Sequence, residues 1–212
     1  VGLTAPTRAV CCYPTDTGWI DAQVALIRGA LADVAADAPA DVPTRILFSA
    51  HGLPKKVIDA GDPYQWQVEQ TASAVAGQLP AGTDWRVCYQ SRVGPLEWIG
   101  PSTEAELESA AEAGVGVIVV PIAFVSEHSE TLVELDIEYR ELAERLGVAF
   151  YRRVAAVATA APFIDGLAAM VRGAVAGKRD LACGEGGGGR VCPARPGACP
   201  LRPAPGAAAP AA

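Results

Sequence analysis

The sequence predicts a three-layer α/β fold built around a parallel β-sheet. Short apolar runs alternate along the chain with amphipathic segments of roughly 10 to 18 residues, a pattern that requires right-handed βαβ crossovers. Half of the 212 residues are hydrophobic and 19% are charged, which is typical of a globular chain with a real core. Both observations favour one large domain, or two small ones, over a disordered or fibrous chain.

The first part of the chain supplies two strand–helix pairs. Residues 8–12 form a short apolar strand candidate, and a turn leads into a helix expected over 19–36, whose apolar residues recur at helical spacing. Residues 45–49 form the second strand, which delivers His51 at its carboxyl end. The next helix is expected over 64–78, with a proline in its first turn.

The second part continues the alternation to residue 176. A capping box, Thr103-x-x-Glu106, predicts a helix start, and Gly147 predicts the end of an acidic helix. The expected elements are a strand over 85–90, a loop over 91–102, a helix from 103 to about 113, a strand over 115–120, an acidic helix to about 146, a strand over 148–154 and a helix over 161–176.

Charge and hydropathy exclude several function classes. The net charge of −7 argues against a nucleic-acid groove, which needs a basic stripe. No apolar run approaches the ~20 residues of a membrane span, and no signal-peptide pattern opens the chain, so we expect a cytoplasmic protein. The chain begins with Val1 and leads directly toward a strand, which indicates a sequence cut from something longer.

Polar side chains follow three of the predicted strands where those strands end. These are His51, the 90–98 loop and the 126–130 segment. Because ligands bind beyond the carboxyl ends of strands in open parallel sheets, we expect these three groups to gather at one rim.

The segment that follows the fourth strand carries Glu130, Glu134 and Glu138, four residues apart. On an α-helix these acids would form one ridge, and like charges at that spacing repel by roughly 0.2–0.5 kcal/mol per pair. A solvated acidic face is the plain interpretation. His128 opens the ridge and apolar residues flank it, so we favour a lined cavity that can hold a cation.

Six cysteines suggest a metal or iron–sulfur site, because disulfides are rare in intracellular α/β proteins. The tail, 179–212, is rich in Gly and Pro and cannot bury a core. It carries Cys183, Cys192 and Cys199, whose spacing matches no common zinc knuckle, and a disordered tail with idle thiols is the alternative. Cys88 lies inside a predicted strand and is expected to be a buried small hydrophobe.

Four stretches together resemble the ferrochelatase family, which inserts ferrous iron into protoporphyrin IX. They are FSAHGLP (48–54), GDPY (61–64), YQSRVGPLEWIGPST (89–103) and PIAFVSEHSETLVELDIEY (121–139). The resemblance implies two Rossmann-like, chelatase-like halves with a porphyrin cleft between them. Residues 1–178 would then be the second half, with 1–44 open to assignment as part of the interdomain region, and 179–212 would be a tail.

The resemblance also implies roles for individual residues. His51 and Glu130 are expected to be the catalytic pair and the ligands of the Fe²⁺ substrate, facing each other across the porphyrin. Ser91, Trp98, Phe124 and His128 are expected to bind the porphyrin. Glu134 and Glu138 are expected to continue a path for metal or protons. Glu127 departs from the aspartate of several family members and receives no role.

Some ferrochelatases hold a [2Fe–2S] cluster with three C-terminal cysteines and one from the body. Cys183, Cys192 and Cys199 match those three, and either Cys11 or Cys12 is expected to be the fourth. Plain alternatives remain open for other residues: a turn-capping role for His51, a core position for Trp98 and helix N-cap packing for His128.

Two other functions compete with this interpretation. The chain could belong to a chelatase for coproporphyrin III or another tetrapyrrole, or the isolated piece could be an iron–sulfur or iron-binding module without catalysis. The expected partners are protoporphyrin IX and Fe²⁺, with no nucleic acid. Peripheral contact with the inner membrane is compatible with an apolar porphyrin substrate, although no amphipathic basic helix supports it.

Overall fold

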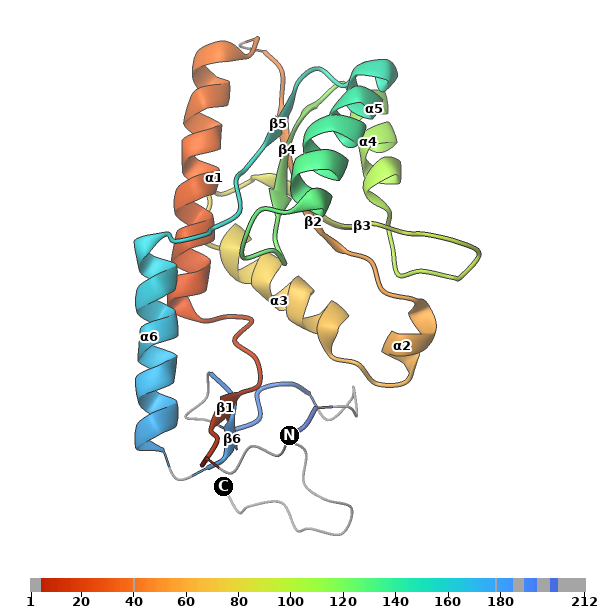
Figure 1. The fold of residues 1–212 in the computed structure, drawn as a ribbon. Helices are drawn as coiled ribbons and strands as arrows, with labels where there is room; N and C mark the ends of the chain where they lie inside the picture. Colours follow the sequence, from red (N-terminus) through yellow and green to blue (C-terminus); the bar gives the residue numbers. More distant parts are fainter. Residues whose placement is uncertain (1–4, 40, 178, 185–188, 194–198, 202–212) are drawn as a thin grey trace.

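The computed structural model describes residues 5–39, 41–177, 179–184, 189–193 and 199–201, and its centre is a four-stranded parallel sheet (Figure 1). The strand order is β3-β2-β4-β5, and every neighbouring pair is parallel. The strands are β2 (Thr44–His51), β3 (Asp84–Gln90), β4 (Gly116–Pro121) and β5 (Tyr151–Arg153). The predicted parallel α/β fold is therefore confirmed.

Helices cover both faces of this sheet and give the three expected layers. They are α1 (Thr17–Asp37), α2 (Lys55–Asp59), α3 (Tyr64–Ala76), α4 (Thr103–Glu112), η1 (Glu130–Glu138), α5 (Tyr139–Leu146) and α6 (Ala161–Ala176). Residues of α1, α3 and α6 share one hydrophobic cluster with the sheet, and residues of α4, η1 and α5 share the other. Figure 1 shows α1 and α6 side by side on one side, with α4 and α5 on the other.

The central strands are continuous hydrophobic runs because helices bury both of their faces. Every residue of β4 is buried, and so are the six inner residues of β2. In register, His51 at the end of β2 lies beside Gln90 at the end of β3. This pairing places two polar side chains together at the carboxyl rim of the sheet.

The strand predicted over 8–12 does not join this sheet. It is reduced to β1 (Ala9–Val10), which pairs in parallel with β6 (Leu181–Ala182) from the beginning of the tail. The backbone pairing extends to the next residues, since Cys11 N donates to Ala182 O and Gly184 N donates to Cys12 O, each over 2.9 Å. Two chain segments far apart in the sequence therefore meet beside the lower end of α6 (Figure 1).

Two local predictions need correction. Ser102, and not Thr103, caps α4, because the Ser102 hydroxyl accepts from Ala105 N over 3.1 Å. The Thr103 side chain is instead buried against Ser49 and Cys88. The last strand of the sheet is shorter than the expected 148–154, and α2 was not predicted.

The acidic segment is a π-helix, η1, followed by α5, and not one continuous α-helix. The Tyr139 N–H accordingly bonds to Glu134 O, five residues back. Side chains from neighbouring elements bind carbonyls of this wide helix: Gln90 binds Glu130 O, Tyr151 binds Leu135 O and Arg140 binds Asp136 O. The prediction of an α-helical ridge of acids is therefore wrong, because these tertiary contacts favour the wider turn.

Candidate active site

His51 and Glu130 are in direct contact at the carboxyl rim of the sheet. His51 Nδ1 lies 2.8 Å from Glu130 Oε2, and the two side chains are 40% and 34% exposed. β2 delivers the imidazole, and the first residue of η1 delivers the carboxylate. A ring inserted between them would need about 7 Å, which is two carbon contacts of ~3.5 Å. The two side chains therefore meet directly at the rim, and the expectation that they face each other across a bound macrocycle stays a prediction.

Tyr64 supports the histidine from the first turn of α3. Its hydroxyl donates to the His51 carbonyl oxygen over 3.0 Å. Burial, followed by the charge of Glu130, raises the pKa of Tyr64 to about 12, so the hydroxyl remains a neutral donor near pH 7. Tyr64 belongs to the GDPY stretch, but its hydrogen bond to His51 could not be predicted from spacing.

Gln90 joins the ends of β2 and β3 to the π-helix. Its Oε1 accepts from Ser49 Oγ over 2.8 Å, and its Nε2 donates to Glu130 O and to Glu134 Oε2, each over 2.9 Å. The Glu134 carboxylate also accepts from Ser91 N over 2.7 Å and from the Ser91 and Tyr139 hydroxyls. The Glu134 carboxylate thus accepts hydrogen bonds from four donors. This favours a structural anchoring role over a role in passing metal ions or protons. Glu138 is exposed. Among the described residues, no hydrogen bond joins its side chain to Gln90, Ser91 or Glu134.

His128 and Phe124 lie on the segment between β4 and η1. The Phe124 and His128 rings are 5.0 Å apart between centroids, and His128 Nδ1 accepts from Glu130 N over 3.2 Å. The imidazole thus accepts a backbone N–H at the start of η1, whose N-cap residue is Ser129, and His128 remains exposed. Phe124 is buried and packs beside it.

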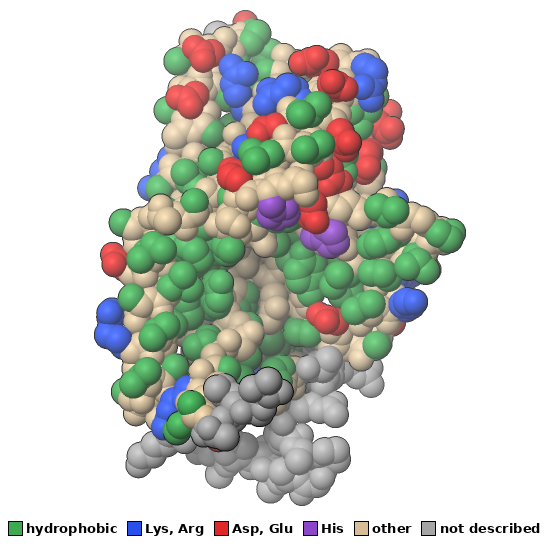
Figure 2. Space-filling model, viewed as in Figure 1, with side chains coloured by type: hydrophobic (Ala, Val, Ile, Leu, Met, Phe, Trp, Pro, Cys, Tyr) green, Lys and Arg blue, Asp and Glu red, His purple; other side chains and the backbone are tan. Residues whose placement is uncertain are grey.

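Trp98 is half-buried and lies against the segment that follows His51. A β-bridge pairs it with Pro54, and the indole passes close to Gly52, where a Cβ would lie 3.5 Å from the ring. The same Cβ would lie 2.9 Å from Gln90 O, so this close approach requires glycine. Figure 2 shows both histidines together on one face, with acidic side chains on one side of them and a hollowed hydrophobic surface on the other.

Three cysteine thiols from the two ends of the chain converge below the sheet. Cys11 Sγ lies 3.3 Å from Cys12 Sγ, Cys12 Sγ lies 3.6 Å from Cys183 Sγ, and all three lie within 4.8 Å of one another. Cys192 and Cys199 are also buried, and the charge of Cys199 is among the causes that raise the pKa values of the Cys11 and Cys192 thiols, which places Cys199 near both. Burial is the largest cause of the raised pKa values of Cys11, Cys12 and Cys192.

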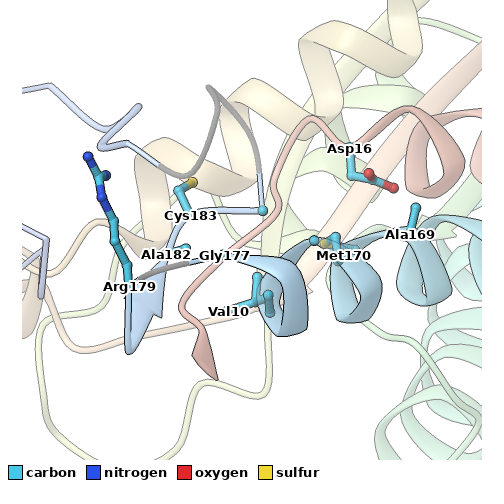
Figure 3. A pocket seen from close by; sticks show the side chains of 11 residues that line it. Val10, Asp16, Ala169, Met170, Gly177, Arg179, Ala182 and Cys183 are labelled. Atoms are coloured by element: carbon cyan, nitrogen blue, oxygen red, sulfur yellow. The ribbon is translucent and has the colours of Figure 1, made fainter. Parts of the chain in front are cut away.

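A cavity of about 540 Å³ lies between α6, β1 and β6, and Cys183 is one of its lining residues. Figure 3 shows Cys183 and Met170 at its wall, with small residues of α6 along one side. Closely spaced, partly buried thiols are the donor set that a metal or an iron–sulfur cluster uses. Cys88 does not take part: it is fully buried in β3, as predicted.

The comparisons with known proteins agree with these features. The family model described as Ferrochelatase matches residues 2–175. The ferrochelatase of Caulobacter vibrioides is 56% identical over 194 residues, which cover 89% of this chain and 55% of the relative. The ferrochelatase of Phenylobacterium zucineum is 50% identical over 196 residues, covering 92% and 55%. Among solved structures, SirB from Bacillus subtilis aligns with a TM-score of 0.46 at 16% identity, covering 74% of this chain and 54% of SirB.

The chain spans about half the length of the curated relatives it matches. In the described part of the chain, no helix is both long and apolar enough to cross a membrane.

Proposed function

The chain belongs to the ferrochelatase family, and we propose that its whole protein is a lyase that inserts Fe²⁺ into protoporphyrin IX to give protohaem. The 2.8 Å contact between His51 and Glu130 carries the proposal. A base and a hard oxygen ligand meet there at a strand-end rim, beside a hydrophobic surface suited to a flat apolar ring.

The reaction exchanges two pyrrole protons for one ferrous ion. With Nδ1–H donated to Glu130, the His51 Nε2 lone pair is free to take a pyrrole proton or to bind the metal. The carboxylate orients the ring and, by its charge, stabilises the imidazolium that forms. Each proton accepted at Nε2 leaves to solvent before the next is taken, so two protons depart for each iron inserted.

The surrounding residues orient the porphyrin and the pair. Trp98, Phe124 and His128 provide ring surfaces for the macrocycle, and the Ser91 hydroxyl provides a polar contact at the cleft wall. The metal or proton path through Glu134 and Glu138 remains a prediction, and the four donors on Glu134 favour an anchoring role for it.

We infer that the converging cysteines hold a [2Fe–2S] cluster. Cys183, Cys192 and Cys199 would supply three ligands, and Cys11 or Cys12 the fourth. The gathering of the Cys11, Cys12 and Cys183 thiols, with Cys183 at the wall of a cavity, supports this. Such a cluster can accept or release one electron at this site. Cys192→Ser should abolish the visible charge-transfer absorption and the electron paramagnetic resonance signal of the reduced protein, and persistence of both would refute the assignment.

The decisive experiment is anaerobic metallation followed through the porphyrin Soret band. The full-length parent should metallate protoporphyrin IX with Fe²⁺, while His51→Ala and Glu130→Gln should lose at least tenfold in rate. Glu141→Gln, an exposed acid on α5, is the matched control and should retain full activity. Turnover within threefold of the parent in either variant would refute the role assignment.

The same assay separates the alternatives. Faster metallation of coproporphyrin III would favour that substrate, and a cluster spectrum without metallation by the parent would favour an iron–sulfur module. A cytoplasmic location, with or without peripheral contact with the inner membrane, stays a prediction from the sequence.

A further inference from the structure

Arg153, the last residue of β5, binds two carboxylates that flank the active-site acid. Its Nε and Nη2 donate to the two oxygens of Asp136 over 2.7 and 2.8 Å, and its Nη1 donates to both oxygens of Glu127 over 2.9 and 3.1 Å. The guanidinium is only 10% exposed. One side chain thus grips the chain three residues before Glu130 and six residues after it.

The Asp136 end of this clamp holds the second half of the π-helix. From the same strand, the Tyr151 hydroxyl donates to Leu135 O over 2.7 Å. Arg140 donates to Asp136 O over 2.9 Å and lies over the Tyr151 ring. β5 therefore ties two successive residues of η1 to the sheet, one through a backbone carbonyl and one through a carboxylate.

The Glu127 end holds the turn that leads from β4 into η1. Besides Arg153, the Glu127 carboxylate accepts from Ala156 N over 2.8 Å and from the Thr131 hydroxyl. The Thr131 oxygen in turn accepts from His128 N over 3.0 Å. Glu127 is thus the hub of the turn that presents His128 and Glu130, although its sequence position suggested no role.

We propose that Arg153 is a positioning residue for metal insertion: by holding Glu127 and Asp136 together, it keeps the Glu130 carboxylate against His51. A bidentate guanidinium fits this task because its planar fork fixes direction as well as charge. A lysine ammonium is a point charge with three donors, so it could not bind both oxygens of both carboxylates in one plane. The activity arm of the test rests on the proposed function, whereas the exchange arm below does not.

A merely structural ion pair is the competing explanation, and the chain offers a matched control for it. Arg45 is equally buried, at 9% exposure, and pairs with Asp84 over 2.8 Å at the amino end of β2. Arg45→Met removes a comparable guanidinium–carboxylate pair from the opposite end of the sheet. Arg153→Met removes two such pairs and Arg45→Met removes one, so the comparison is made on kcat and on local exchange and not on stability. A loss confined to Arg153→Met then reports on position.

The activity arm compares variants of the full-length parent. Arg153→Met should lower kcat at least tenfold while the porphyrin KM stays within threefold, and Arg153→Lys should recover part of the loss. Arg45→Met should keep kcat within twofold. In a Glu130→Gln background, Arg153→Met should cost less than a further twofold, because the carboxylate it positions is already gone. The proposal would be overturned if Arg153→Met lowered kcat by a further tenfold in the Glu130→Gln background. It would also be overturned if Arg153→Met and Arg45→Met lowered kcat equally.

The exchange arm measures backbone hydrogen exchange and needs no turnover. Arg153→Met should speed exchange of the amides of Glu130–Glu138 about tenfold, whereas Arg45→Met should leave them unchanged. Unchanged protection in Arg153→Met would refute the clamp even if the parent metallates porphyrin. Failure of the parent to metallate would instead refute the proposed function, and the exchange result would still decide the clamp.

Discussion

Two buried glutamines of this chain should respond in opposite ways to the same substitution. Gln90 is fully buried, and its amide makes hydrogen bonds to Ser49, Glu130 and Glu134. Gln23, in α1, is 1% exposed, and neither atom of its amide has a hydrogen-bond partner among the described residues. Leucine has a similar size, so Gln→Leu changes hydrogen bonding more than packing.

The expected magnitude follows from the groups left behind. Gln90→Leu removes one hydrogen bond from the Ser49 hydroxyl and one from the Glu130 carbonyl, and each loss costs about 1 kcal/mol. It also removes one from the Glu134 carboxylate, which costs about 1.5–3 kcal/mol because that group is charged. The free energy of unfolding should therefore fall by roughly 4 kcal/mol. Gln23→Leu removes an unpaired buried amide and should be neutral or stabilising by about 1 kcal/mol.

Urea unfolding of the two variants and the parent measures the difference, with circular dichroism and tryptophan fluorescence as independent probes. Gln90→Leu should also slow metallation, because Gln90 holds the backbone of Glu130. Equal losses of stability in the two variants would show that the hydrogen bonds of Gln90 do not anchor η1 to the sheet, and this reasoning would be refuted.

Two further predictions test the packing and the electrostatics. Gly18→Ala should lower the free energy of unfolding by about 1–3 kcal/mol, because the added Cβ would lie 2.3 Å from Pro162 O and overpack α1 against α6. Gly29→Ala, in the same helix but facing open space, should raise it by about 0.5–1 kcal/mol. Thermal unfolding of both variants checks this, and similar shifts in the two would contradict it. Burial, then Glu130, raises the pKa of Tyr64 from 10.0 to about 12, so its stabilising contribution is complete below pH 10 and is lost as the pH rises toward 12. In Tyr64→Phe, the free energy of unfolding should fall less between pH 10 and pH 12 than it does in the parent. Unfolding titrations across this pH range measure the difference, and identical pH profiles would count against the prediction.

Much of the fold could be predicted because local patterns and tertiary structure agree in the sheet. The apolar runs of β2 and β4 are continuous since both faces are covered, and the helices between strands require parallel pairing. Parallel strands end at the same rim, so the meeting of His51 with the segment that carries Glu130 was also predictable from topology. Cys88 was placed correctly for the same reason, as an apolar position within a buried strand.

Local sequence patterns were thus enough to predict the fold class, the rim at which polar groups gather and the family resemblance. How those groups are held depends on contacts between distant parts of the chain. An acidic segment with α-helical spacing became a π-helix, because Gln90, Tyr151 and Arg153 bind it from the sheet, and no local pattern encodes those distant donors. The pairing of β1 with β6, which brings Cys12 to Cys183, likewise depends on contacts across about 170 residues of chain, where periodicity carries no information.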